Sequence, residues 1–319
     1  MEKVVIIGAG VAGLACLNAL LDCHVRPILI EAGKIGSNKI CGEFLSLAAC
    51  CQLETWGIGP IQKIDSITIE SSGTKLKTQQ KAGAMNRSEA EKQLAERAKS
   101  LGGTIMENTK IIKTSYDSVT LFDNTTIKAK NIIIATGALG PKPKDFPYIG
   151  LKAHFLHDSY KPNLEMHLFK GGYFGIVPIS TTTSNIACLV KESAKAEALV
   201  QMNKELAWLT APVGSFGMKK VPIVDSTYYI GDAIASLPPA IGGGFGHAIN
   251  SAILCAKHLV HDGSSKEYLQ ELRATLSTKM ILARLINQIM LSPIAANFTL
   301  KLLQNSPKLQ NRLLHHIGL

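Results

Sequence analysis

The sequence lacks the cysteine spacing that metal sites and dithiol redox centres need. Its seven cysteines are scattered, odd in number and without a C-x-x-C pair, at positions 16, 23, 41, 50, 51, 188 and 255. Cys50 and Cys51 are adjacent, and adjacent cysteines rarely form a useful redox pair. The pattern argues against a disulfide framework, a zinc site and a redox-active dithiol. We therefore expect no bound metal and a reducing compartment.

The sequence also has no run of residues that is apolar enough to cross a membrane. The longest candidate, Met280–Leu300, contains Arg284 and Pro293. At the other end, the apolar run Val4–Ile7 leads directly into a glycine turn, with no basic segment before it and no cleavage site after it. We expect no signal peptide and a cytoplasmic location, with association at a membrane surface left open.

Acidic residues are missing from the C-terminal part of the chain. From Leu272 onward there is no Asp or Glu, but there are six Lys or Arg residues, at positions 273, 279, 284, 301, 308 and 312. Apolar residues at helical spacing, such as Ile281 and Leu285, predict two or three amphipathic helices broken at Pro293 and Pro307. Residues 263–319 should therefore form a basic helical tail.

The partner of this tail is not fixed by the sequence. Basic amphipathic helices rest on an anionic membrane surface, cover a lipophilic pocket, or pack on the core with their lysines in water. All three interpretations stay open. Nucleic acid is not an expected partner, because no basic helix with interleaved aromatic residues is present.

The beginning of the chain carries an alternating β and α pattern. It contains an apolar strand, a glycine turn and a helix in "KVVIIGAGVAGLACLNALL", followed by a second strand that ends in an acid in "RPILIEAG". This βαβ unit predicts a parallel sheet. The content of 46% hydrophobic residues is enough for a large core.

The glycine turn has the spacing of a dinucleotide site. In a G-x-G-x-x-G turn between strand and helix, Gly8 permits the tight turn, Gly10 lets a pyrophosphate approach, and Gly13 lets helix and strand pack closely. The phosphates would meet the amides at the start of the helix. Glu31, at the end of the second strand, is placed to bind a ribose hydroxyl.

The rest of the chain divides into two expected parts. Ser88 and Glu91 form a capping box for a helix that runs to about Ser100. We assign residues 1–62, 80–149 and 226–262 to a split nucleotide-binding domain. The strand-like residues 63–79 and 150–225 should form a separate antiparallel sheet, which we take as the substrate domain.

Two later segments carry a resemblance to a known family. "IIIATG" and "YYIGDA" are buried strands that end in Thr136-Gly137 and Gly231-Asp232. With the first glycine turn, they resemble the FAD-dependent oxidoreductases of the glutathione reductase superfamily. The resemblance implies an α/β fold, with a Rossmann-type FAD-binding domain and an inserted antiparallel sheet. It also gives Asp232 a hydrogen bond to the ribityl chain of FAD.

A longer segment narrows the resemblance. "GDAIASLPPAIGGGFGHAINSA" is similar to a segment of the para-hydroxybenzoate hydroxylase-like branch, which includes aromatic monooxygenases and geranylgeranyl reductases. There the proline and the glycine turn lie against the flavin, and a helix points its amides at the ring. The expected FAD contacts are Gly8, Gly10, Ala12, Gly13, Glu31, Ala32, Cys41, Gly42, Arg87, Thr136, Gly137, Gly231, Asp232, Pro238, Gly242, Gly244 and Phe245.

Three residues are candidates for catalysis. Cys41 belongs to "CGEFLS", which resembles the C-G-[E/D]-x-L-S segment that borders the flavin in geranylgeranyl reductases and related flavoproteins. Cys41 either faces the flavin or substrate as a proton donor or an electronic tuner, or is small because the backbone passes under the cofactor. His154 and Tyr173 are further candidates for substrate contact, although such residues are more often structural.

Features that are missing limit the reaction. A second G-x-G-x-x-G unit is absent, so a separate NAD(P)H domain is not expected. The segment Tyr173–Pro178, "YFGIVP", lacks both the W-x-W-x-I-P element of flavin halogenases and the Y-x-W-x-F-P element of geranylgeranyl reductases. The D-G motif of many aromatic hydroxylases is also missing, which leaves NADPH docking without a sequence signal.

We therefore expect an FAD-dependent oxidoreductase with NADPH or NADH as electron donor. The favoured reaction is a monooxygenation of an apolar or aromatic small molecule. One alternative is a geranylgeranyl reductase-like enzyme that saturates isoprenoid chains at a membrane surface, with Cys41 as proton donor. Another is a non-catalytic flavin- or lipid-binding protein.

Overall fold

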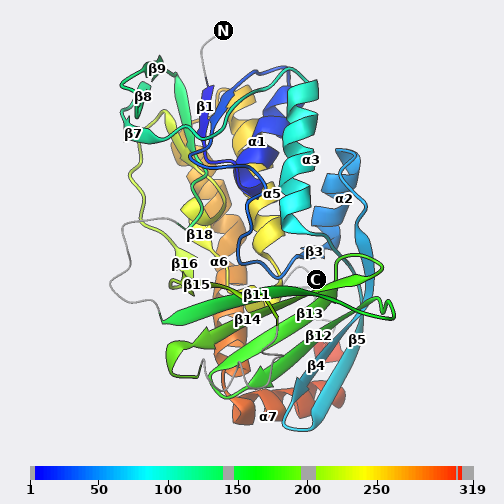
Figure 1. Ribbon diagram of the computed structural model, residues 1–319. Coiled ribbons are helices and arrows are strands. Elements are labelled where there is room, and N and C mark those ends of the chain that lie inside the picture. The colour runs from blue at the N-terminus through cyan, green and yellow to red at the C-terminus, as the bar shows by residue number, and fades with distance from the viewer. Residues whose placement is uncertain (1–3, 139–146, 195–205, 307, 311–319) are drawn as a thin grey trace.

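Two β-sheets, one above the other, organise the chain in the computed structural model (Figure 1). The structure describes residues 4–138, 147–194, 206–306 and 308–310. The upper part holds a parallel sheet with its helices, and the lower part holds a larger sheet that two C-terminal helices cover. The α/β fold class expected from the sequence is confirmed.

The upper sheet is parallel throughout. Its strand order is β17 (Thr227–Tyr229), β10 (Asn131–Ile134), β1 (Val4–Ile7), β2 (Ile28–Ile30) and β6 (Thr104–Met106). The helices packed with it are α1 (Val11–Asp22), α3 (Arg87–Ser100) and α5 (Gly244–Val260). Helix α1 lies between α3 and α5 and buries residues on all its sides, which explains its continuous apolar sequence (Figure 1).

A small antiparallel sheet covers the other face of β1. It consists of β7 (Ile111–Thr114), β8 (Ser118–Leu121) and β9 (Thr126–Lys128). Its buried Val119 and Leu121 pack with Val5 and Ile7 of β1. All four residues of β1 are buried, as expected for a strand covered on both faces.

The lower sheet has eight strands. Their order is β15 (Leu209–Val213), β11 (Tyr148–Leu156), β14 (Thr183–Lys191), β13 (Gly172–Pro178), β12 (Asn163–Phe169), β4 (Gln62–Ser71), β5 (Thr74–Ala84) and β3 (Phe44–Ser46). The expectation of a purely antiparallel sheet was wrong, because β12 pairs with β4 in parallel. This pairing joins two segments far apart in the sequence, and no local pattern reports it.

The structure also moves two expected boundaries. Strand β5 continues to Ala84 and pairs there with β3, so residues 44–46 and 80–84 lie in the large sheet. The reason is packing, because Phe44 and Ala84 are buried together with Ile64 of β4. The domain division predicted from the sequence assigns both segments to the nucleotide domain.

Helix α3 begins differently from the expected capping box. Its N-cap is Asn86, whose side chain accepts a hydrogen bond from the amide of Glu89 at 3.2 Å. The hydroxyl of Ser88 instead donates to the carbonyl of Gly36, and Glu91 is turned inward. The helix ends at Ser100, as expected.

Two helices of the basic tail are described. Helix α6 (Ser265–Met290) starts at a capping box of Ser264 and Glu267, and α7 (Pro293–Gln304) follows after a bend of 113°. Within the described residues no single helix is long and apolar enough to span a membrane, although this bent pair passes the same test when taken together. Pro307, expected to break the tail again, lies outside the described residues.

Candidate functional site

The glycine turn has the geometry that its sequence requires. Gly8 adopts φ +102°, and a side chain on Gly13 would start 1.9 Å from the carbonyl oxygen of Gly8. A Cβ on Gly13 would therefore break the contact between the turn and α1, and a Cβ on Gly8 would lie 2.6 Å from the carbonyl oxygen of Ala135 after β10. Gly231 is constrained in the same way, because a Cβ there would lie 2.7 Å from that of Ala12. These four residues therefore hold strand, helix and late loop together.

Glu31 lies directly beside the turn. Its Oε2 accepts a hydrogen bond from the amide of Ala9 at 2.6 Å, and its Oε1 accepts one from the amide of Gly33 at 3.0 Å. Ala32 connects the two. The hydrogen bonds of Glu31 thus hold the end of β2 against the glycine turn, where the sequence predicts that a ribose would bind.

Three other glycines have no role in packing. The position of a Cβ on Gly42 or Gly244 has no atom within 4 Å, and on Gly10 the nearest atom is the Arg87 Nη2 at 3.7 Å. None of the three has a positive φ. Neither the backbone nor the neighbours demand glycine there, so the open space fits a ligand that passes close to the backbone. The residues present therefore fit FAD, and the sequence predicts that Gly10 would face its pyrophosphate and Gly42 and Gly244 its flavin ring.

The loop before α5 forms the end of this cradle. Pro238 is followed by the short 3₁₀ helix η3 (Pro239–Ile241) and by Gly242 with φ +60°. A side chain on Gly242 would meet the ring of Phe44 at 2.6 Å. Helix α5 then begins at Gly244, with its amide end toward the open space and Phe245 buried in the core.

A cluster of buried charges borders the glycine turn. Arg87 Nε donates to Oε1 of the fully buried Glu91 at 2.8 Å, while Oε2 of Glu91 has no hydrogen-bond partner among the described residues. Burial opposes the charge of Arg87, but the nearby Cys41, Glu91 and Asp232 raise its pKa. Arg87 is therefore a fixed cation beside Gly10, where a pyrophosphate would lie.

Asp232 lies at the same end of the site, in the 3₁₀ helix η2 (Gly231–Ala233). Burial raises its pKa, against the lowering effect of His247, Arg87 and Lys219. His247 is buried with Nε2 at 3.1 Å from the carbonyl of Gly231, and burial lowers its pKa. A neutral imidazole and an acid that is costly to ionise suit hydroxyl partners, such as a ribityl chain.

Lys219 was not predicted. It follows strand β16 (Gly217–Met218), which pairs with β18 (Ala235–Ser236), and its Nζ reaches the carbonyl of Gly137 at 3.5 Å. Burial lowers its pKa, although Asp232 raises it. Lys219 thus connects Thr136-Gly137 after β10 with the Gly231-Asp232 loop. No motif marks a lone lysine in a middle segment.

The most prominent polar group of the site is Glu43. It is fully buried and has φ +56°. Its Oε1 accepts hydrogen bonds from Lys152 Nζ at 2.6 Å and from the Arg87 amide at 2.9 Å, and its Oε2 lies 2.8 Å from His154 Nε2. Burial disfavours the carboxylate, but His154, Lys152 and the Arg87 amide outweigh it and lower the pKa of Glu43. Glu43 is therefore a buried anion with a complete set of donors.

The sheet register explains this meeting. Lys152 and His154 are two residues apart on β11, so their side chains leave the same face of the lower sheet. That face also holds Asn185, the cross-strand partner of His154, whose Nδ2 donates to the carbonyl of Cys41 at 3.2 Å. Oδ1 of Asn185 is buried and has no hydrogen-bond partner among the described residues. The K-A-H pattern on a strand is the signal by which the pair with Glu43 could have been found.

Cys41 lies at the edge of this network. The amide of Glu43 donates to its Sγ at 3.3 Å. Burial raises the pKa of the Cys41 thiol, and the charge of Glu43 adds to this, against Arg87 and Lys152. The group is therefore a neutral thiol and not a thiolate. Both interpretations of Cys41, proton donor or small residue under the cofactor, stay predictions.

Tyr173 shares the sheet face of His154 but has a different partner. It is 3% exposed, and its hydroxyl donates to Asn287 Oδ1 of α6 at 3.0 Å. Burial raises its pKa well above the ordinary value. The structure therefore brings Cys41 and His154 together through Glu43, whereas Tyr173 joins the sheet to α6.

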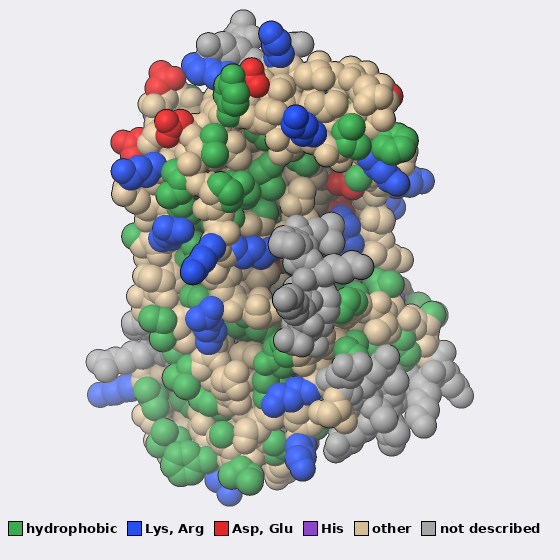
Figure 2. Space-filling view, turned by 90° about the vertical axis from the view of Figure 1, so that its left-hand side faces the viewer, with side chains coloured by type: hydrophobic (Ala, Val, Ile, Leu, Met, Phe, Trp, Pro, Cys, Tyr) green, Lys and Arg blue, Asp and Glu red, His purple; other side chains and the backbone are tan. Residues whose placement is uncertain are grey.

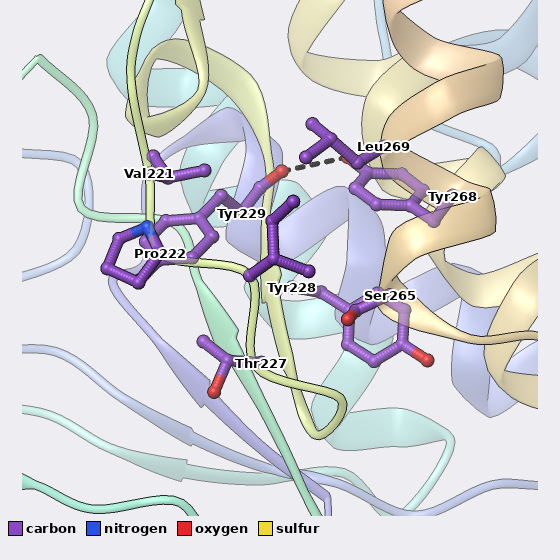
Figure 3. A pocket seen from close by; sticks show the side chains of 9 residues that line it. Val221, Pro222, Thr227, Tyr228, Tyr229, Ser265, Tyr268 and Leu269 are labelled. Carbon is purple, nitrogen blue, oxygen red and sulfur yellow. Dashed lines mark hydrogen bonds between the residues drawn. The ribbon is translucent and has the colours of Figure 1, made fainter.

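A small hollow lies elsewhere, at the edge strand β17. Figure 3 shows the segment of Val221 and Pro222 on one side and Tyr268 of α6 on the other. The Tyr268 hydroxyl donates to the carbonyl of Tyr229 at 2.9 Å, drawn as the dashed line. None of the predicted FAD contacts lines this hollow.

Comparison with known proteins places the chain in a family. The model of the pyridine nucleotide-disulphide oxidoreductase family matches residues 2–167, just over half of the chain. The chain belongs to this family. It is an FAD-dependent oxidoreductase, as the glycine turn, Glu31 and the open cradle indicate. The name of this family refers to a disulphide, but the sequence holds no C-x-x-C pair and the cysteines of the described residues are free.

Solved structures share the whole fold at low sequence identity. The chain superposes on P. aeruginosa PqsL in complex with 2-aminobenzoylacetate with a TM-score of 0.79, at 14% identity, covering 93% of this chain and 99% of PqsL. The flavin-dependent brominase Bmp2 superposes with a TM-score of 0.81 at 17% identity, covering 99% of this chain and 93% of Bmp2. A geranylgeranyl bacteriochlorophyll reductase-like protein from Thermoplasma acidophilum superposes with a TM-score of 0.73 at 16% identity, covering 99% of this chain and 100% of that protein. No curated protein matches the chain.

Proposed function

We propose that the protein is a monooxygenase-type flavoenzyme that takes electrons from NADPH or NADH and hydroxylates an apolar or aromatic small molecule. The overall reaction consumes one substrate, one O₂, one NAD(P)H and one proton, and yields the hydroxylated product, water and NAD(P)⁺. FAD, when bound, supplies the redox chemistry between nicotinamide and oxygen. The protein's own part is to bind, to orient and to move a proton.

The observation that carries the proposal is the pairing of His154 with Glu43. His154 is 29% exposed at its side chain, whereas Glu43 is fully buried. A buried carboxylate that holds one ring nitrogen fixes both the orientation and the tautomer of the imidazole. The other nitrogen, Nδ1, forms no hydrogen bond with the described residues. His154 can therefore give and regain the proton that the reduction of oxygen to water requires.

The position of the pair supports this role. Glu43 follows Gly42, whose open side fits the flavin, and it binds the amide of Arg87 next to Gly10. Hydrogen bonds therefore connect His154 to Glu43, and Glu43 to Arg87 beside the cofactor cradle. His154 and Lys152 lower the pKa of Glu43, so Glu43 is an anion that can accept a hydrogen bond from the imidazole.

The comparisons support the substrate class and the reaction. PqsL is described as "a probable FAD-dependent monooxygenase" and was solved with 2-aminobenzoylacetate, an aromatic compound. The lack of tryptophans in Tyr173–Pro178 disfavours a halogenase, despite the similarity to Bmp2.

A second candidate is a reductase of isoprenoid double bonds. It is favoured by the C-G-E-x-L-S segment at Cys41 and by the similarity over the full length of the Thermoplasma protein. In that case His154 or Cys41 would hold the proton that is added to carbon.

Oxygen uptake distinguishes the candidates. FAD-loaded protein is given NADPH or NADH with panels of small aromatic and prenylated compounds, and oxygen and products are measured. The proposal expects a compound that stimulates oxygen uptake and gains one oxygen atom from ¹⁸O₂. Anaerobic saturation of a prenylated compound would instead establish the reductase. Absence of NAD(P)H oxidation with every compound would contradict both and leave a flavin-binding protein.

A further inference from the structure

Helix α7 has hydrophobic side chains on two opposite sides. One side, with Ala296, Leu300 and Leu303, is buried against the lower sheet. Ile294 and Phe298 lie on the opposite side, four residues apart, and are 86% and 72% exposed. Leu302 continues the row one turn later and is 49% exposed. Both apolar sides of the helix favour burial, and the described chain covers only one of them.

Helix α6 shows the same feature before the bend. Its buried side includes Met280, Ala283 and Asn287, which face the rest of the protein. Ile281 and Leu285 point the other way and are 71% and 57% exposed. Exposed apolar side chains are thus repeated on both helices and do not stand singly.

From Leu272 onward the charged side chains of these two helices have one sign. Lys301, Lys308 and Arg284 are exposed on the same two helices and the turn after them, and no Asp or Glu occurs from Leu272 onward. In Figure 2 the lower half of the described surface in view carries hydrophobic and basic side chains and no acidic ones, at the height of α7.

We propose that this apolar row of α7, which we call the α7 face (Ile294, Phe298 and Leu302), binds to the surface of an anionic lipid bilayer. Apolar side chains would enter the boundary between headgroups and acyl chains, and Lys301 and its neighbours would meet the anionic headgroups. The helix would lie on the bilayer and would not cross it, because α7 has twelve residues and is bent away from α6 by 113°.

The charge decides between a bilayer and a second copy of the chain. Two α7 faces in contact would bring two basic surfaces together, in a protein with a net charge of +10. Like charges across an interface oppose association. An anionic bilayer offers apolar cover and the opposite charge at once. The proposal does not depend on the reaction that the flavin site performs.

Vesicle flotation tests the proposal. FAD-loaded protein is mixed with phosphatidylcholine vesicles with or without one third of phosphatidylglycerol, and floated at low and at high salt. We expect flotation with the anionic vesicles at low salt, and much less with neutral vesicles or at high salt. No flotation with anionic vesicles at low salt overturns the proposal.

Two variants identify the surface. Phe298→Ser should weaken binding to anionic vesicles by about tenfold or more, because it removes an aromatic side chain that would be buried in the bilayer. Its matched control is Phe122→Ser, in which the residue is also 72% exposed but follows β8 in the upper part. Lys301→Glu should weaken binding about tenfold, while Lys128→Glu on β9 should change it little.

Equal loss in Phe298→Ser and Phe122→Ser, or no loss in either, would overturn the assignment to α7. Sedimentation velocity covers the other occupant. If the protein does not bind vesicles but forms a dimer that Phe298→Ser dissociates, the α7 face joins two copies of the chain and the bilayer proposal is wrong. All four sites are exposed, so circular dichroism and the flavin spectrum should match the unaltered protein.

Discussion

Glu43 Oε2 lies 2.8 Å from His154 Nε2, although 111 residues separate the two in the sequence. The acid lies directly before β3, and the histidine lies near the end of β11. Their contact links the cofactor cradle to the lower sheet. Together with the contact of Lys152 Nζ with Glu43 Oε1 at 2.6 Å, it connects the two parts of the site, and the first predictions concern it.

His154→Gln should slow turnover without loss of FAD. Removal of a positioned acid–base group costs about 10²–10⁴-fold in rate. We expect kcat to fall within that range while the affinity for FAD stays unchanged. The control is His167→Gln on β12, where the ring stacks on Phe174 away from Glu43. Equal rates in the two variants would show that His154 has no role in catalysis.

Glu43→Gln should destabilise the protein strongly. The change leaves the buried Lys152 ammonium without its counter-ion, which typically costs about 3–5 kcal/mol. The double variant Glu43→Gln/Lys152→Met should recover part of this loss, since no unpaired charge remains. Urea unfolding of the FAD-loaded proteins measures both values. An additive double variant would contradict the ion pair.

The same ion pair predicts a dependence on pH. Donors lower the pKa of Glu43 below its ordinary value of 4.5, so its stabilising contribution is complete above that value. The contribution is lost as the pH falls through the lower, folded-state pKa. The stability difference between the unaltered protein and Glu43→Gln should therefore shrink in acid below about pH 4.5. Unfolding curves at several acid pH values would show a constant difference if Glu43 were not an anion in the fold.

Gly42→Val tests the FAD cradle. No protein atom lies within 4 Å of a Cβ at this position, so the FAD-free variant should unfold at the same urea concentration as the FAD-free parent. FAD affinity should fall by about 10–100-fold, which corresponds to about 1–3 kcal/mol of overpacking. Gly13→Ala is the contrast, because its Cβ would meet the Gly8 oxygen and should harm stability as well. A large loss of stability in Gly42→Val would mean that the protein itself fills the space.

Cysteine labelling tests the environment of Cys41. Burial raises the pKa of its thiol, and it raises that of Cys188 to about 12. Iodoacetamide near neutral pH should therefore modify the exposed Cys23 and Cys51 well before Cys41. Mass spectrometry of the digested protein gives the order. Rapid labelling of Cys41 would indicate a thiolate and a direct chemical role.

Several features of the fold could be predicted because they are local. The strand, turn and helix around Gly8 and Gly13 follow from apolar periodicity and from glycines that no other residue can replace. The helices of the tail likewise follow from residue spacing and from Pro293. In each case the signal and the structure lie within one short stretch of sequence.

Features that depend on pairing between distant segments could not be predicted. The parallel contact of β4 with β12 and the placement of β3 beside β5 are set by side-chain packing across the sheet. The cap of α3 is Asn86 and not Ser88, since the Ser88 hydroxyl is used by Gly36. Lys219 carries no motif, and Glu43 was seen only as part of a segment resembling other flavoproteins.

The central claim is that this chain holds a redox-active FAD in the cradle of Gly10, Gly42 and Gly244. The most direct measurement is an anaerobic titration of the FAD-loaded protein with NADPH and with NADH, followed by air, while the visible flavin absorbance is recorded. We predict that one of the two nucleotides bleaches the flavin and that oxygen restores it. A flavin that stays oxidised with both nucleotides would contradict the account.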